Sequence, residues 1–158
     1  MDDDCLPEKN WLSKIRNILK EHQQDRIVFQ GKINNFYLKR TLTSQLHQLV
    51  YQAEVDAYYN GLKKNQLIDF LHAGNFFALR STLKTLPFLF DEQNFPFIGE
   101  ERDLAYRLQL AGCQIHFQPQ VELEHKIISS GSIWQAWKNS WEIGRAEGIL
   151  VKIGRAHV

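Results

Sequence analysis

The sequence predicts an α/β fold built as a single layered domain. The chain has 158 residues, and 44% of them are hydrophobic, which is enough for one real core. Segments whose apolar residues recur at helical spacing alternate with short apolar runs that end at glycine or proline. No repeat of solenoid period and no low-complexity linker divides the chain, so the pattern favours one domain with helices packed on a sheet.

The elements of the first half follow from this spacing. Pro7 is expected to begin a first helix whose apolar face includes Trp11. Arg26 to Gln30 is typical of a short buried strand, which should end at Gly31. A second apolar stripe predicts a long helix from about Thr41 to Tyr59.

The middle of the chain predicts two short strands and a short helix. Leu67 to His72 reads as a strand that Gly74 breaks. Phe76 to Arg80 resumes the extended structure, and a short helix is expected from Ser81.

The last third predicts two helices around one strand. Glu100 to Leu110 forms a helix whose early acidic residues suit the positive end of the helix dipole, and Gly112 ends it. Gln114 to Gln118 is a strand that Pro119 closes. A final helix is expected from about Ser132 to Glu147.

This final helix carries Trp134, Trp137 and Trp141 on one face, and the stripe has two interpretations. Packing against the sheet is the simpler one. Contact with a membrane surface is the other, with Lys138 and Arg145 nearby.

Residues 149–158 are expected to form a tail outside the domain. Ile153 to Val158 matches the translation of a common sequencing adapter, so we predict that this segment is read-through rather than protein. A genuine basic tail is the alternative, because Ile143 to Ala146 contains the same Ile-Gly-Arg-Ala sequence.

Composition narrows the classes of partner and compartment. The net charge is +1, so no basic excess indicates nucleic acid, and we expect no nucleic-acid partner. The two cysteines, Cys5 and Cys113, are far apart and outside any metal-ligand spacing, which favours a reduced, cytoplasmic location. The cytoplasmic face of a membrane is included in this expectation. The apolar runs are too short to span a bilayer.

Three consecutive carboxylates, Asp2, Asp3 and Asp4, stand at the start of the chain. Two carboxylates at i and i+2 can place oxygens on one hard cation, and Mg²⁺ or Mn²⁺ completes its shell with phosphate oxygens and water. An acidic segment that is merely solvated is the alternative for these residues alone.

Five segments, in this order, resemble motifs of family 2 glycosyltransferases. They are Asp2 to Leu12 (an Asp-x-Asp segment), Gly74 to Arg80, Phe90 to Glu92 (Phe-Asp-Glu), Gly99 to Leu108 (close to Gly-Glu-Asp-x-x-Leu-x-x-Arg) and Pro119 to His125. The resemblance implies a partial GT-A fold, a mixed sheet flanked by helices, whose N-terminal nucleotide-binding half is missing. Residues 1–148 would then be the catalytic, acceptor-side part of one domain, expected to be poorly soluble and inactive alone.

The resemblance also implies roles for individual residues. Asp4 would be the direct ligand of Mg²⁺ or Mn²⁺, and Asp2 would face the metal and the nucleotide of a nucleotide-diphosphate sugar. Glu101 stands where the family has the aspartate that deprotonates the acceptor. Because glutamate has a longer arm, Glu100 is the alternative base.

Four further positions have two readings each. Arg107 would contact the diphosphate or pair with Asp103 four residues earlier. His125 would reach the metal or diphosphate, or belong to an ordinary hydrogen-bond network. Gly74 and Asn75 would line the acceptor pocket or form only a turn. His72 and His116, inside apolar strands, are expected to be structural.

The function that follows is transfer of a sugar from a nucleotide-diphosphate donor to a hydroxyl acceptor, glycan or lipid-linked, with inversion and a divalent metal. Two alternatives stay open at this point. One is a non-catalytic binding or scaffold module that keeps the fold. The other is nucleotidyl or phosphoryl transfer on a related α/β fold, although no phosphate-binding glycine loop is present.

Overall fold

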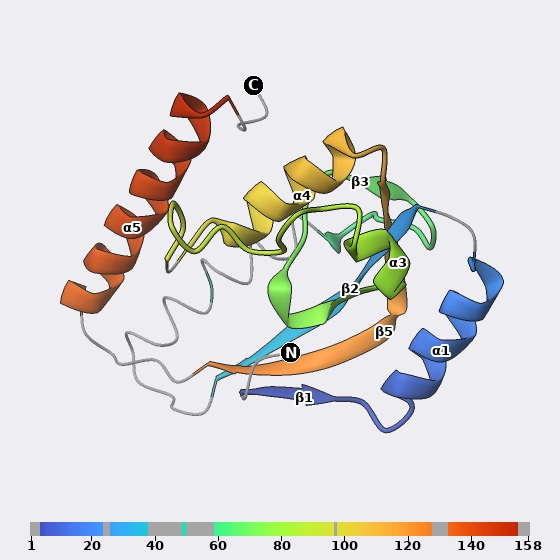
Figure 1. The fold of residues 1–158 in the computed structure, drawn as a ribbon. Helices are drawn as coiled ribbons and strands as arrows, with labels where there is room; N and C mark the ends of the chain where they lie inside the picture. The colour runs from blue at the N-terminus through green and yellow to red at the C-terminus, as the bar shows by residue number, and fades with distance from the viewer. Residues whose placement is uncertain are drawn as a thin grey trace.

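The computed structural model describes residues 4–23, 26–37, 49, 59–96, 98–127 and 133–154, and every structural statement concerns this part of the chain. The predicted α/β class is confirmed, because a mixed sheet is flanked by helices (Figure 1). The helix predicted from Thr41 to Tyr59 lies outside the described residues apart from Leu49 and Tyr59. Asp2 and Asp3 lie outside them as well.

The sheet is built around two long parallel strands. Its strands are β1 (Cys5–Pro7), β2 (Ile27–Tyr37), β3 (Leu67–Ile68), β4 (Phe76–Ala78) and β5 (Gln114–Ile127). The order is β1-β5-β2-β4, with β3 paired to β5 beside this path. Strands β2 and β5 are parallel, and the other pairs are antiparallel. The sheet is therefore mixed, as the family resemblance implies.

Helices α1 (Trp11–Glu21) and α4 (Glu100–Leu110) cover opposite faces of this sheet. Successive residues of a strand point to opposite faces, and β2 follows this rule. Val28 packs in the cluster that contains Leu104 of α4, whereas Phe29 packs in the cluster that contains Ile15 of α1. All four side chains are buried, so each face carries its own apolar core.

The first helix begins later than predicted. Pro7 is the last residue of strand β1 and pairs with Leu123, so the expectation that it opens the helix is wrong. Proline has no backbone N–H to donate, and an edge strand such as β1 tolerates it. The chain then turns, with the Trp11 N–H donating to the Glu8 carbonyl at 3.0 Å, and α1 starts at Trp11.

Strands β2 and β5 both continue past the residues expected to end them. Gly31 pairs with Gln118, but Lys32 pairs with Glu122, so a register shift separates the two halves of the ladder. Pro119 lies in this irregularity, where its missing N–H breaks no ladder bond. The predicted strand ends at Gly31 and Pro119 are wrong, and both strands run on toward the predicted site at His125.

Asn75 fills the irregularity with hydrogen bonds. Its Nδ2 donates to the carbonyls of Lys32 at 2.8 Å and Val121 at 2.9 Å, and its Oδ1 accepts the indole N–H of Trp11 at 2.9 Å. The side chain is buried, with 1% exposure. Gly31 leaves the room for it, since a Cβ there would collide with the Asn75 amide and the Val121 carbonyl.

The predicted strand from Leu67 to His72 is mostly wrong, since β3 ends at Ile68. The buried Gln30 side chain holds the following segment instead of a strand ladder. Its Oε1 accepts the His72 N–H at 2.7 Å, and its Nε2 donates to the Asn75 carbonyl at 3.3 Å. A short 3-10 turn η1 (Ala73–Asn75) results, and β4 then begins at Phe76 as predicted. It ends at Ala78 rather than Arg80, because helix α3 (Arg80–Leu83) starts one residue earlier than expected.

Helix α4 has the bounds that the sequence predicts. Gly99 precedes it with φ 99°, in the left-handed region that glycine favours, and a Cβ there would press on Phe95 and Ala146. Gly112 follows it with φ 78°. The backbone conformation of these two glycines sets both boundaries, so the bounds of the helix can be predicted from the sequence.

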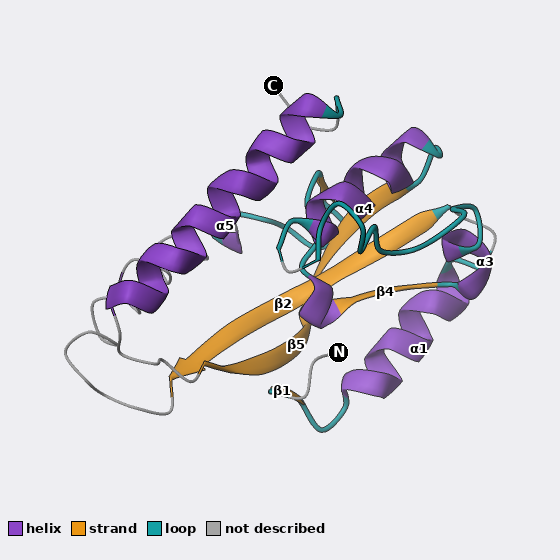
Figure 2. Cartoon of the chain, turned by 60° about the vertical axis from the view of Figure 1, so that its left-hand side comes forward, coloured by secondary structure: helices purple, strands orange, loops and turns teal. Residues whose placement is uncertain are grey.

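Helix α5 (Ile133–Lys152) is longer than predicted and stands apart from the sheet in both views (Figures 1 and 2). It packs through Ala146 and Leu150 against Phe95, and Leu150 is 2% exposed. Residues 149–152 are therefore part of a packed helix rather than of a tail. The read-through prediction is untested, and residues 155–158 lie outside the described part.

The tryptophan stripe of α5 faces outward. Trp134, Trp137 and Trp141 are 68%, 56% and 62% exposed, so the expectation that they pack against the sheet is wrong. The rings stack on one another, with centroids 5.0 Å and 6.2 Å apart. Contact with a membrane surface stays a prediction. Among the described helices, none combines the length and apolarity needed to cross a membrane.

Candidate functional site

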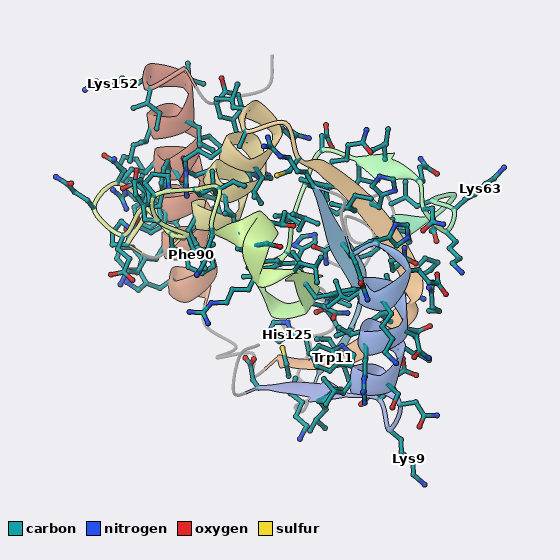
Figure 3. The ribbon with its side chains drawn as sticks, turned by 45° about the vertical axis from the view of Figure 1, so that its right-hand side comes forward. Lys9, Trp11, Lys63, Phe90, His125 and Lys152 are labelled. Carbon is teal, nitrogen blue, oxygen red and sulfur yellow. The ribbon has the colours of Figure 1, made fainter. Side chains whose placement is uncertain are left out.

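Three adjacent strands place polar side chains in one row across the sheet. In the register of the ladder, Cys5 of β1 and Asn35 of β2 are the partners of His125, which lies between them on β5. Asp4 comes directly before β1, and its carbonyl accepts the Lys126 N–H at 2.9 Å. Figure 3 shows His125 beside strand β1. The sheet therefore joins the two ends of the predicted donor site.

The side chains of this row are close enough to act together. His125 Nε2 lies 3.2 Å from Asp4 Oδ2, and His125 Nδ1 lies 3.1 Å from Asn35 Oδ1. The Cys5 Sγ lies 3.7 Å from Asp4 Oδ1. One ligand atom from each of Asp4, Cys5 and His125 lies within 4.8 Å of the others. The Asp4 and His125 side chains keep 41% and 30% exposure, so a solute can reach them.

The donor atoms of this cluster fit a divalent metal. Asp4 offers carboxylate oxygens, and His125 offers an imidazole nitrogen whose partner nitrogen is engaged by Asn35. A hydrogen bond to the ring nitrogen that faces away from the metal orients a metal-ligating histidine. Imidazole suits transition metals, whereas Mg²⁺ prefers oxygen ligands, so the described residues match Mn²⁺ better than Mg²⁺.

Glu101 faces a separate cavity of about 200 Å³ near the start of α4. The cavity is lined by residues of three segments, among them Phe70, His72, Ile98, Glu101, Arg102 and Glu147. Burial raises the pKa of Glu101, and the neighbouring Glu100 carboxylate raises it further. The Ala73 N–H lies 3.5 Å from Glu101 Oε1. This carboxyl group is thus prepared to take a proton closer to neutral pH.

The two candidate bases differ in where they point. Glu101 lines the cavity, whereas Glu100 does not. Glu100 Oε2 is buried without a hydrogen-bond partner among the described residues. The helix start therefore brings one acidic side chain, and not both, to the space where an acceptor could lie.

His72 lines the same cavity, although the sequence suggested only a structural role. Burial, with a smaller contribution from the charge of Arg102, lowers the pKa of His72 from 6.5 to about 4. The imidazole is therefore neutral at physiological pH. A neutral ring beside Glu101 can exchange hydrogen bonds with a hydroxyl group without adding a charge to the cavity.

The lowered pKa of His72 predicts acid instability. The unfolded chain binds a proton near pH 6.5 and the folded chain only near pH 4, so stability is complete above pH 6.5 and falls between these values as the pH decreases. The full loss amounts to about 3 kcal/mol. Urea unfolding from pH 7 to pH 4 measures it.

The matched variants for this prediction are His72→Gln and His22→Gln. His72→Gln should flatten the dependence over this pH range, because the glutamine side chain does not titrate. The control variant His22→Gln should keep the wild-type pH dependence of stability, because His22 lies next to Phe29 on α1's side of the sheet. An unchanged pH profile in His72→Gln would refute the assignment.

Arg107 is bound by the protein on every side of its guanidinium. Its Nε donates to Asp103 Oδ2 at 2.7 Å, and its terminal nitrogens donate to the carbonyls of Phe88 and Leu89. The group also lies 4.6 Å from the centroid of the Phe88 ring. The ion pair predicted as one alternative is thus present, and the predicted diphosphate contact stays a prediction.

The acceptor pocket predicted at Gly74 and Asn75 finds no support in their surroundings. The Asn75 side chain is buried and its hydrogen bonds go to the sheet and to α1, as described above. Gly74 belongs to the turn that carries these bonds. Both residues position the chain between the cavity and the row at His125, and the cavity lining is supplied by other residues.

Three residues of the site were not identified from the sequence. The spacing of Cys5 to Cys113 fits no metal-ligand motif, so the sequence does not indicate Cys5 as a ligand. Asn35 lies in a polar pair that belongs to no motif. His72 was read as structural. The pairing of β1 and β2 with β5 reveals Cys5 and Asn35, and such pairing leaves no local pattern in the sequence.

Comparison with known proteins shows the family of this chain. A family model described as glycosyltransferase-like family 2 matches residues 1–142, which is most of the chain and includes Asp4, Glu101 and His125. A search of curated proteins found no significant match. The chain belongs to the glycosyltransferase-like family 2 and is a transferase at the level of that family.

Proposed function

We propose that the protein transfers a sugar from a nucleotide-diphosphate donor to a hydroxyl acceptor, with inversion and with a divalent metal. The observation that carries the proposal is the Asp4–His125 pair, in which a carboxylate and an imidazole 121 residues apart lie 3.2 Å from each other. The family resemblance implies an acidic motif and a closing histidine segment at these two positions, which supports the proposal. A scaffold module would have no need to keep this pair accessible to solution.

Among the described residues, three form the donor side of the proposed site. Asp4 and His125 would hold the metal, and Asn35 would keep the imidazole nitrogen directed toward it. A bound divalent cation would neutralise the negative charge that develops on the departing diphosphate. Of Mg²⁺ and Mn²⁺, these ligands favour Mn²⁺, because imidazole suits a transition metal. Asp2, which the family resemblance places beside them, remains part of this proposal.

The acceptor side is the cavity that contains Glu101. The acceptor oxygen forms a bond to the anomeric carbon, the bond from that carbon to the diphosphate oxygen breaks with its electron pair, and the proton passes to the Glu101 carboxylate. A single displacement of this kind inverts the anomeric carbon. The raised pKa of Glu101 supports its assignment as base, because a proton acceptor works best when its pKa approaches the working pH.

The lining of the cavity suggests the chemistry of the acceptor. Phe70 and Ile98 offer apolar surface, whereas His72, Arg102 and Glu147 offer polar groups, of which Arg102 and Glu147 form an ion pair with each other. Such a mixture suits one sugar ring of a glycan or of a lipid-linked acceptor. Localisation at a membrane surface, with α5 as the contact, is the corresponding proposal for a lipid-linked substrate.

The metal assignment predicts a specific loss of Mn²⁺ binding. In electron paramagnetic resonance titrations, Asp4→Asn and His125→Ala should each weaken Mn²⁺ binding by at least about tenfold, because each removes a ligand. Glu124→Gln is the matched control, since this exposed carboxylate neighbours His125 but takes no part in the cluster. Equal Mn²⁺ affinity in Asp4→Asn and Glu124→Gln would overturn the donor site.

A product analysis separates sugar transfer from the nucleotidyl alternative. A panel of nucleotide-diphosphate sugars labelled in the sugar and in the nucleotide is incubated with Mn²⁺ and an acceptor. Sugar transfer leaves the label of the nucleotide in a nucleoside diphosphate. Appearance of the nucleotide label on the acceptor would favour nucleotidyl transfer.

A further inference from the structure

We propose that Cys5 turns the donor-metal cluster into a site that selects Zn²⁺ over Mn²⁺, through a thiolate bond that the hard cation does not favour. This inference rests on the proposed function, because Asp4 and His125 serve both metals. Its new content is the third ligand, Cys5, and the inhibition that follows from it.

The separations of the ligand atoms suit one tetrahedral zinc ion. Zinc lies about 2.3 Å from a thiolate sulfur and about 2.0–2.2 Å from imidazole nitrogen or carboxylate oxygen, so two ligand atoms of a tetrahedron lie about 3.3–3.6 Å apart. The sulfur of Cys5 lies 3.7 Å from Asp4 Oδ1, and the His125 nitrogen lies 3.2 Å from Asp4 Oδ2. These two contacts involve different oxygens of the Asp4 carboxylate, and one ligand atom from each residue lies within 4.8 Å of the others, so side-chain rotation would bring all three atoms onto one ion.

The backbone holds the three ligands in place without an ion. Cys5 and His125 are direct partners in the antiparallel ladder of β1 and β5. The Asp4 carbonyl accepts the Lys126 N–H, which fixes the residue that precedes the strand. Asn35 engages the far nitrogen of His125. A preorganised site of this kind requires no rearrangement of the sheet when zinc binds.

The choice of ligands decides between the two cations. Divalent affinity rises from Mn²⁺ to Zn²⁺ at most nitrogen and oxygen sites, and a thiolate enlarges the difference because sulfur is a soft ligand. Cys5 is 7% exposed, so the sulfur would be held in a largely water-free position. With three protein ligands, zinc would occupy the place of Mn²⁺ and act as an inhibitor of Mn²⁺-dependent transfer.

The test measures metal binding directly on the full chain. Competition with a chromophoric chelator gives the Zn²⁺ affinity, and resonance titration gives the Mn²⁺ affinity. Cys5→Ala should weaken Zn²⁺ binding by at least about tenfold and change Mn²⁺ binding by less than about twofold. Cys113→Ala is the matched control, since it removes a buried cysteine of the α4 core and should change neither affinity.

Cobalt provides a spectroscopic readout on the wild-type chain itself. Co²⁺ bound to a thiolate shows a sulfur-to-metal charge-transfer absorption in the near ultraviolet, which the wild-type chain should display and Cys5→Ser should lack. Absence of this band from the wild-type chain at saturating Co²⁺ would overturn the inference. This holds even if circular dichroism shows that Cys5→Ala does not fold. Equal losses of Zn²⁺ and Mn²⁺ affinity in a folded Cys5→Ala would also overturn it.

These outcomes are distinct from a failure of the proposed function. Loss of Mn²⁺ binding in Asp4→Asn supports the donor site whatever Cys5 does. If Cys5→Ala leaves Zn²⁺ affinity unchanged while Asp4→Asn loses Mn²⁺, the zinc inference fails and the donor site stands. If Asp4→Asn loses neither cation, the donor site itself fails.

Discussion

Replacing Glu101 with glutamine is expected to lower sugar transfer by about 10²–10⁴-fold, the range that a positioned general base contributes. Glutamine keeps the size of the side chain and its place in the cavity but cannot accept the acceptor's proton. The substitution replaces one carboxylate oxygen by an amide nitrogen. The burial of this side chain, which raises the pKa of Glu101 in the wild type, therefore stays the same. Steady-state transfer to a hydroxyl acceptor at saturating nucleotide sugar measures the loss in kcat.

Glu100→Gln is the matched control for this variant. It removes the adjacent carboxylate from the same helix turn but leaves the cavity lining intact, so a loss of less than about tenfold is expected. Mn²⁺ affinity should be the same in both variants, because neither residue belongs to the cluster of Asp4, Cys5 and His125. Unchanged transfer by Glu101→Gln would remove this residue from the mechanism.

Asp103→Ala is expected to lower the free energy of unfolding by about 3–5 kcal/mol, the cost of removing one partner of a buried ion pair. The Asp103 side chain is fully buried, and the Arg107 side chain is 9% exposed. Without the carboxylate, a buried guanidinium keeps its charge and only the carbonyls of Phe88 and Leu89 as partners. Urea denaturation at pH 7 gives the change.

An exposed pair in α5 supplies the comparison. Arg145 and Glu142 have the same charges at similar spacing, with a distance of 2.8 Å, but their side chains are 40% and 25% exposed. Glu142→Ala should therefore cost less than about 1 kcal/mol. A similar loss in Asp103→Ala and Glu142→Ala would show that burial of the first pair carries no special weight.

The parts of the fold that could be predicted from the sequence are those decided by neighbours along the chain. Helix α4 has the predicted bounds, because Gly99 and Gly112 adopt left-handed backbone conformations that end or precede a helix by themselves. The strand ends at Gly31 and Pro119 were predicted wrongly for the opposite reason. Whether these residues stop a strand depends on the partner strand, and here both fall in a shared register shift.

The same distinction between local and tertiary causes holds for the candidate site. The order of the acidic and histidine segments was enough to indicate a family 2 glycosyltransferase, and with it the roles expected of Asp4, Glu101 and His125. Sequence alone left Arg107 between two roles. The structure shows it bonded to Asp103 and to two carbonyls, since the helix brings the pair together and the 88–89 segment closes over it.

Family membership, the α/β class and the helix that carries Glu101 were therefore determined by the sequence itself, because each depends on short segments and on their order. Only the tertiary structure decided that Cys5 and Asn35 flank His125 and that His72 shares the cavity of Glu101. These neighbours come from strands and turns far apart in the chain. Strand pairing and burial bring them together, and neither leaves a periodic pattern that a reader of one sequence could follow.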